Sequence, residues 1–136
     1  EILLENYCKT LHIEAKTLKS MVRQELLPGL MTYADTVADS IRKKREVLAD
    51  LPCGAQEKLL AGLSDSYEKI CDAQERLEED PAKAEEMTDS ADVAAFYHDV
   101  VLADMDEVRA LADAAECCLP DGVLPYPSYE KLLFTV

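Results

Sequence analysis

Apolar residues recur every three or four positions along the first third of the sequence, and this spacing constrains the fold more than any other feature. The positions in this run are Leu4, Tyr7, Leu11, Ala15, Leu18, Val22, Leu26, Leu30, Tyr33, Val37, Ile41 and Leu48. Residues at this spacing line one face of an α-helix. The sequence therefore predicts one very long helix over residues 1–49.

Pro28 stands inside this helix. A proline within a helix removes one backbone hydrogen bond, and its ring clashes with the preceding turn. A clean break would favour a capping residue just before the proline, but Leu27 is there and the apolar register crosses Pro28 without slipping. We predict a kink at Pro28 rather than two separate helices, with the first turn at residues 51–54.

Two further helices are predicted over residues 55–79 and 90–119. The apolar face of the first is formed by Leu59, Leu63, Tyr67, Ile70, Gln74 and Leu77, and that of the second by Tyr97, Val101, Met105, Val108, Leu111, Ala115 and Cys118. Asp80-Pro81 is a helix-start signature, which suggests a short extra turn in the connection between these two helices. Pro120 is expected to end the last helix.

The fold class follows from these helices, which would cover about three quarters of the chain, far above the usual third. Only 4 glycines and no tryptophan occur among the 136 residues, and this length fits one domain with one core. Helices joined by short connections pack antiparallel. We predict an all-α domain, an up-down helical bundle with a long kinked first helix.

The segment 120–136 is rich in proline and tyrosine. Pro125-Tyr126-Pro127 is predicted to be extended, and Ser128 can cap one last helical turn. The candidate interaction residues in this tail are Tyr126, Tyr129, Leu132, Leu133 and Phe134. Such an apolar patch is unusual in water, so we expect the tail to dock, either on its own bundle or on a neighbouring subunit or domain.

Charge and cysteine usage restrict the partners and the compartment. A net charge of −14 repels nucleic acids and anionic membranes. The basic run Arg42–Arg45 is interpreted as a solvated last helical turn, although a binding patch is an alternative. The 5 cysteines form no C-x-x-C pair, which favours a reducing cytoplasm. No stretch is apolar enough for a membrane span.

Position 1 is Glu rather than Met, and a helical pattern is already running at residues 2–7. No capping residue precedes this pattern, as a helix start would favour. We therefore expect this domain to be a part of a longer chain.

The residues capable of catalysis or metal binding form no arrangement that we recognise, so we expect no catalytic, cofactor-binding or metal-binding residue. His98-Asp99 with Asp104 is a weak candidate metal cluster, because neighbours on a helix point in different directions. His12 is interpreted as a surface residue. The pair Cys117-Cys118 lies at a helix C-terminus, which disfavours a thiolate, so we expect it to pack. Carboxylate pairs such as Asp104 and Glu107 arise from the acidic composition alone.

Several segments resemble the region that follows the catalytic domain in type III glutamine synthetases. The matching residues near the beginning are Glu5-Asn6-Tyr7, Leu11 to Thr17, Met21, Leu27-Pro28 and Tyr33. The later ones are Phe96 to Val101, Met105, Val108-Arg109, Ala112-Asp113, Pro125 to Tyr129 and Leu132-Leu133-Phe134. His98 departs from the pattern, in which an arginine is expected.

This resemblance implies that the parent is an ATP-dependent glutamate–ammonia ligase of nitrogen metabolism. Such a parent would use divalent metal ions and form hexameric rings in the bacterial cytoplasm, while none of its metal, nucleotide or glutamate ligands maps onto this chain. Our main hypothesis is a non-catalytic domain that packs on the catalytic domain or on neighbouring subunits of a homo-oligomer. An independent acidic adaptor that binds a basic protein, and a small metal- or thiol-dependent enzyme, are the alternatives.

Overall fold

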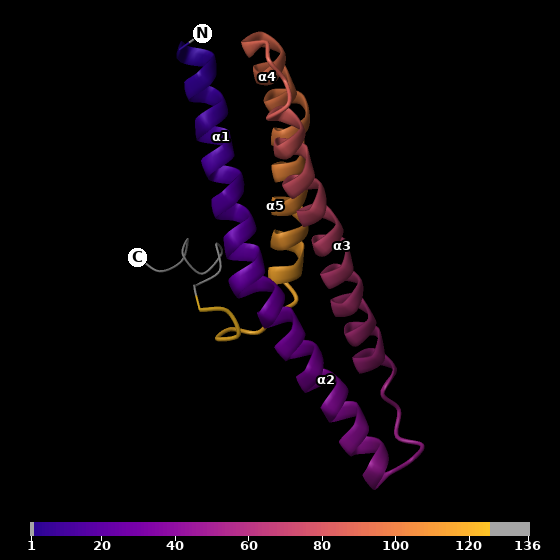
Figure 1. Cartoon of the computed structure of the whole chain (residues 1–136). Coiled ribbons are helices and arrows are strands. Elements are labelled where there is room, and N and C mark those ends of the chain that lie inside the picture. The colour runs from indigo at the N-terminus through magenta and orange to yellow at the C-terminus, as the bar shows by residue number, and fades with distance from the viewer. Residues whose placement is uncertain (1, 126–136) are drawn as a thin grey trace.

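The computed structural model describes residues 2–125, which form three long helical rods and no strand within that range (Figure 1). The first rod consists of α1 (Ile2–Met21), η1 (Val22–Leu26) and α2 (Leu27–Val47). The second is α3 (Gly54–Ala84). The third consists of α4 (Ser90–Phe96), η2 (Tyr97–Val101) and α5 (Leu102–Glu116). The predicted all-α class is confirmed.

The three rods run antiparallel, so the predicted up-down arrangement is also confirmed. α3 returns along α2, and α4 to α5 then returns along α3 (Figure 1). α5 ends near the junction of α1 and α2, so that the far half of the molecule is a two-helix hairpin of α2 and α3. The end that holds the beginning of α1, the end of α3 and α4 is called the α4 end below.

The first rod passes Pro28 without a break, as predicted, because a π-helical turn precedes the proline. Met21, Leu26 and Leu27 all have helical dihedral angles, and the Leu27 N–H donates to the carbonyl of Val22, five residues earlier. A π-helical turn contains one extra residue and is wider than an α-helical turn. In an α-helix, the proline ring would clash with the carbonyl of the residue four positions earlier. The wider turn moves this carbonyl away from the Pro28 ring.

The predicted helix start at Asp80-Pro81 is wrong, and so is the predicted end of the second helix at residue 79. α3 continues through Pro81 to Ala84, and the Pro81 ring is buried. Burial of this apolar ring offsets the one hydrogen bond that the proline cannot donate. The next helix begins instead at Ser90, where the side chain of Asp89 accepts a hydrogen bond from the backbone N–H of Asp92.

A second π-helical turn, η2, divides the third rod and shifts its buried face. The buried positions are Ala94, Tyr97, Val101, Asp104, Met105, Val108, Ala112 and Ala115. Two details of the prediction are wrong: the helix ends at Glu116 rather than at residue 119, and Cys118 is exposed. The chain leaves α5 in a turn three residues before Pro120, so Cys118 lies beyond the packed part of the rod.

The core lies where the three rods approach one another around the two π-helical turns. Its most deeply buried large side chains are Val22, Leu26, Leu30, Ile70, Leu77, Val101, Met105 and Val108. Most of the predicted face of the first rod is buried here. Leu4 and Leu48, at the two ends of that face, are exposed instead because no other rod covers them.

The segment after α5 turns back onto α2. Gly122 has a φ of 88°, which lets the chain reverse, and Val123 and Leu124 then lie against Gly29. A Cβ atom built on Gly29 would lie 2.8 Å from Cδ2 of Leu124. The first part of the predicted tail therefore docks on α2, whereas residues 126–136 lie outside the described residues.

Two glycine substitutions test this contact. Gly62→Ala lies in α3 with open space around the new Cβ, so it should raise the free energy of unfolding by about 0.5–1 kcal/mol through helix propensity. Gly29→Ala has the same propensity gain but must displace Leu124, so its gain should be smaller or reversed. Chemical denaturation of both variants would measure the difference. Equal stabilisation by the two substitutions would contradict the docking of Leu124 on α2.

Candidate functional site

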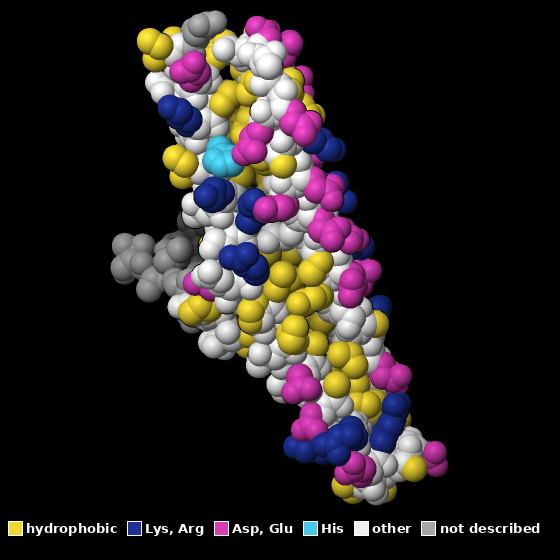
Figure 2. Space-filling model, in the orientation of Figure 1, with side chains coloured by type: hydrophobic (Ala, Val, Ile, Leu, Met, Phe, Trp, Pro, Cys, Tyr) yellow, Lys and Arg dark blue, Asp and Glu magenta, His cyan; other side chains and the backbone are white. Residues whose placement is uncertain are grey.

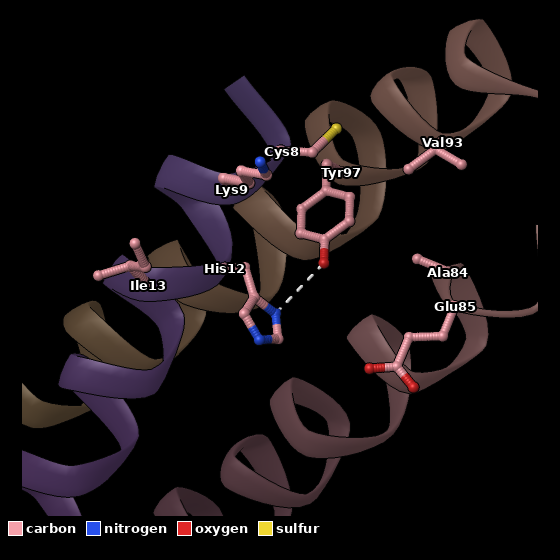
Figure 3. A pocket seen from close by; sticks show the side chains of 8 residues that line it. All are labelled: Cys8, Lys9, His12, Ile13, Ala84, Glu85, Val93 and Tyr97. Atoms are coloured by element: carbon pink, nitrogen blue, oxygen red, sulfur yellow. Dashed lines mark hydrogen bonds between the residues drawn. The ribbon is translucent and has the colours of Figure 1, made fainter. Parts of the chain in front are cut away.

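An open cavity of about 400 Å³ lies at the α4 end, between the first rod and the other two (Figure 3). It is lined by Cys8, Lys9, His12, Ile13, Ala84, Glu85, Val93 and Tyr97. A second cavity of about 240 Å³ shares Cys8, Lys9 and Val93 with it and extends toward Leu4, Thr88 and Ser90. Because they share these residues, the two cavities form one groove along α1, which we call the α1 groove.

The Tyr97 hydroxyl and the Cys8 thiol in the groove are not activated for chemistry. The Tyr97 hydroxyl and Nδ1 of His12 are 3.4 Å apart, a long hydrogen bond across the groove (Figure 3). Burial raises the pKa of the Tyr97 hydroxyl, and burial also raises the pKa of the Cys8 thiol. Both groups therefore keep their protons at neutral pH, which is unsuitable for a nucleophile or a general base.

The mouth of the groove is unusually apolar for a free surface. Ile13, at its rim, is 63% exposed. In Figure 2, hydrophobic side chains are visible between the rods beside the single cyan histidine. Exposed apolar patches of this kind mark surfaces that another protein covers.

The two walls of the groove carry opposite charges. Four cations follow one side of the first rod at helical spacing, namely Lys9, Lys16 and Lys19 of α1 and Arg23 of η1. Figure 2 shows Lys and Arg side chains on this rod beside Asp and Glu side chains on α3. Lys19 donates to Glu78 at 2.5 Å. This bond lowers the pKa of the Glu78 carboxyl most, and the charges of Arg23 and Lys16 lower it further. Glu85 continues the acidic wall beside the cavity.

The strongest electrostatic anomaly lies elsewhere, between α3 and α5. Asp104 is only 9% exposed, and its Oδ2 atom is buried without a hydrogen-bond donor among the described residues. Burial raises the pKa of Asp104 to about 7, and the neighbouring carboxyl of Asp80 raises it as well. The pKa of Asp80 is lowered by its hydrogen bond with Asp104. A proton shared between the two carboxyls supplies the missing donor.

Sequence reasoning attributed Asp104 to the acidic composition and missed this pair. A signal was present, because Asp104 lies three residues after Val101 and four before Val108, on the stripe that faces the core. Glu107, one turn further along the helix, is exposed and forms an ion pair with Arg76 on α3. Asp80 could not be recognised as the partner, because α3 was predicted to end just before it.

The other candidates from the sequence remain apart. His98 and Asp99 are exposed and contact each other at 3.0 Å, while Asp104 points into the bundle. Within residues 2–125, no group of three or more His, Cys, Asp or Glu side chains gathers in a way that could hold a metal ion. His12 is half-buried in the groove rather than a surface residue, which corrects its interpretation. It lies there because Tyr97 extends across from η2.

The vicinal pair Cys117 and Cys118 was expected to pack, and this expectation is wrong. Both side chains are exposed just beyond the end of α5, and all five cysteines are free thiols. The pKa of the Cys71 thiol is raised, mainly by burial and further by the three neighbouring carboxylates Glu68, Asp72 and Glu75.

The basic run at the end of α2 is satisfied within the domain. Arg42 contacts Asp39 and Glu46, Lys43 contacts Asp39, Lys44 donates to Gln56 and Arg45 pairs with Glu57. All four cations are exposed in or next to the last turn of the helix, in agreement with the solvated interpretation. No helix between residues 2 and 125 is long and apolar enough to cross a membrane.

The candidate interaction residues Tyr126, Tyr129, Leu132, Leu133 and Phe134 lie outside the described residues. The structure therefore leaves their predicted docking untested. The α1 groove, in contrast, was not recognised in the sequence. Its residues come from three separate segments, and no local pattern relates Cys8 and His12 to Glu85 or Tyr97.

Comparisons with known proteins point to one family. A family model described as the glutamine synthetase C-terminal domain matches residues 1–45. A glutamine synthetase of Butyrivibrio fibrisolvens is 40% identical over the whole chain, and a type-3 glutamine synthetase of Dictyostelium discoideum is 25% identical over 98% of it. A glutamine synthetase of Bacteroides fragilis is 23% identical over 99% of the chain. No solved structure matches.

The chain therefore belongs to the glutamine synthetase family, in which it corresponds to a C-terminal domain. It spans 19% of the length of each of these three relatives. The resemblance recognised in the sequence is thereby confirmed at the level of the family.

The Asp80–Asp104 pair predicts how stability depends on pH. The pKa of Asp104 is about 7 in the fold and 3.8 in the reference state, so the cost of its buried charge is fully present above pH 7. This cost disappears as the pH falls from 7 toward 4. Asp104→Asn should therefore raise the free energy of unfolding by one to a few kcal/mol at pH 8 and by much less at pH 5.

Chemical denaturation of the wild type and the variant at both pH values would measure this. Asp113→Asn, at an exposed position of the same helix, is the matched control and should change stability equally at pH 5 and pH 8. An Asp104→Asn effect that is also independent of pH would contradict the shared proton.

Proposed function

We propose that this chain is the non-catalytic C-terminal domain of a type III glutamine synthetase. The observation that carries this proposal is the alignment with glutamine synthetases over essentially the whole chain, including one described as type-3. The parent enzyme would join ammonia to glutamate at the expense of ATP, with divalent metal ions as cofactors. The ligands for ATP, glutamate and metal would lie in the remaining part of the polypeptide.

The role of the domain would be to pack against that remaining part and against neighbouring subunits of a homo-oligomer. The apolar mouth of the α1 groove supports this role, because the exposed side chain of Ile13 would be buried by such a contact. The opposite end of the molecule also exposes apolar residues, Val47 and Leu48, but the cavity on that half of α2 is lined by polar side chains such as Asp39 and Lys43.

The tail residues Tyr126, Tyr129, Leu132, Leu133 and Phe134 belong to the same proposal. They follow a segment that Leu124 anchors on α2, so they start from a fixed point on the surface of the domain. Docked on a neighbouring subunit or on the catalytic domain, two aromatic and two leucine side chains would contribute several kcal/mol, before the cost of ordering the segment. The cytoplasm of a bacterium is the location that the family resemblance suggests.

Substitutions in the tail of the full-length protein test the assembly role. Leu132→Asp together with Phe134→Asp should shift the oligomer toward smaller species in analytical ultracentrifugation, because charged side chains cannot enter an apolar contact. Glu130→Gln together with Lys131→Gln alters the same segment without adding charge to it and is the matched control. If the Asp variant keeps both its sedimentation profile and its melting temperature, the proposed role of the tail is wrong.

A binding measurement tests the non-catalytic assignment. The isolated 136-residue chain should give a strongly helical circular dichroism spectrum, and it should give no specific heat on titration with ATP, glutamate or manganese. Isothermal titration calorimetry on a sample whose helical spectrum has been verified would measure this. Micromolar binding of any of the three would show that the chain carries part of an active site.

A further inference from the structure

We propose that the α1 groove receives an amphipathic helix from the part of glutamine synthetase that lies outside this chain. The helix would have an apolar seam, acidic side chains on the side that faces α1 and basic side chains on the side that faces the end of α3. This inference rests on the proposed function, and it specifies the surface and the chemistry of the contact.

The dimensions of the groove fit a short helix. The residues of α1 that line it run from Leu4 to Ile13, which are 9 positions apart, so it is about 14 Å long, the length of two to three helical turns. Its floor is formed by Cys8, Val93 and Tyr97. Beyond Lys16 the groove is closed, because Lys19 bonds to Glu78 and the side chain of Gln74 donates to the Lys19 carbonyl at 3.1 Å.

The arrangement of the rods explains why the groove is open. α3 packs closely on α5, whereas α1 contacts α4 more than it contacts α3. Figure 1 shows α1 leaning away from the other two rods toward the N-terminus. Helical bundles commonly close such a gap with a fourth helix, whose apolar side completes the core. Here the apolar lining includes Ile13 on the α1 side and Val93 on the α4 side, with the ring of Tyr97 between them (Figure 3).

The charges on the two walls define the polar sides of the occupant. Lys9 lines both cavities on α1, and Lys16 lies seven positions further along on the same side of the helix. Neither lysine forms an ion pair with a described residue within 4.0 Å. Glu5 lines the α1 side as well, at the end nearer the N-terminus. Glu85 borders it on α3. A helix between these walls is therefore favoured when its acidic residues face Lys9 and Lys16, and a helix of opposite polarity is repelled.

We infer that the docked helix comes from the remaining part of the parent enzyme, because most of the parent lies outside this chain and the chain's own tail is short. Four fifths of the length of the three relatives lies outside the region that this chain matches. The chain's own residues 126–136 start from Leu124 beside Gly29, and Gly29 is 17 positions from His12, about 26 Å along the rod. Eight fully extended residues span at most about 29 Å, so Leu132 would reach the groove only with the segment from Leu124 to Leu132 almost fully extended.

Zero-length cross-linking of the full-length protein with a carbodiimide identifies the occupant, since this reagent joins a lysine to a carboxylate in direct contact. Mass spectrometry should find Lys9 or Lys16 joined to an acidic residue in the part outside this chain. Links to Glu130 of the tail, to another copy of this domain, or only to carboxylates of the same domain would overturn the proposal.

Alkylation of Cys8 in the same full-length protein measures whether the groove is covered. Cys8 lies in both cavities, so Lys9→Glu with Lys16→Glu should expel the helix and speed alkylation at least about tenfold. Lys58→Glu with Lys69→Glu, two exposed positions of α3 with the same change of charge, should leave the rate unchanged. Cys53 is buried in the core, so its constant rate shows that the fold is intact.

Equal rates for Cys8 in the wild type and in the Lys9→Glu, Lys16→Glu variant, with Cys53 protected in both, would overturn the proposal. The proposed function can survive that result, because it depends on the tail substitutions and on the ligand titration. Conversely, a cross-link from Lys9 to the part of the enzyme outside this chain would support the docked helix even if the tail substitutions had no effect on assembly.

Discussion

The domain depends on the burial of one cluster of aliphatic side chains at the two π-helical turns. Val22 and Leu26 come from η1, Val101 comes from η2, and Ile70 and Leu77 of α3 lie against them. Each fully buried side chain of this kind contributes about 1.5–3 kcal/mol relative to the exposed state. The wider turns place these side chains where the rods meet, so the irregular backbone and the tightest packing occur together.

The two ends of the molecule differ because this cluster lies between them. Toward the hairpin end, only α2 and α3 remain, and their charged residues bond to one another, as Arg45 does to Glu57. Toward the α4 end, three rods are present, but α1 diverges and leaves the apolar residue Ile13 exposed. The hairpin end still exposes Val47 and Leu48, whereas the α4 end combines the exposed Ile13 with an open apolar groove.

The Asp80–Asp104 pair shows that the domain also tolerates a costly interaction in its interior. Two carboxyls that share a proton between α3 and α5 are less stable at neutral pH than an amide or an apolar pair would be. The nearby Arg76 reduces the cost, since its charge opposes the rise in the pKa of Asp104. The pair nevertheless lies away from the α1 groove, so its effect on stability can be measured separately from docking.

The sequence alone determined the number and class of the helices, because helical apolar periodicity is a local property that survives in any all-α arrangement. It also predicted correctly that the helix continues through Pro28, since the apolar residues keep their register on both sides. The end of α3 was mispredicted because Asp80-Pro81 has the local chemistry of a helix start, and only burial of Pro81 against other rods outweighs that preference.

The tertiary structure decided everything that depends on residues far apart in the chain. His12 meets Tyr97 across 85 positions, and Asp80 meets Asp104 because α3 and α5 are antiparallel. The α1 groove likewise exists only because α1 diverges from α3, and that angle is set by how the side chains at the two π-helical turns pack. A periodic pattern shows which side of a helix is buried. It does not show which element packs against that side, or where no element packs against it.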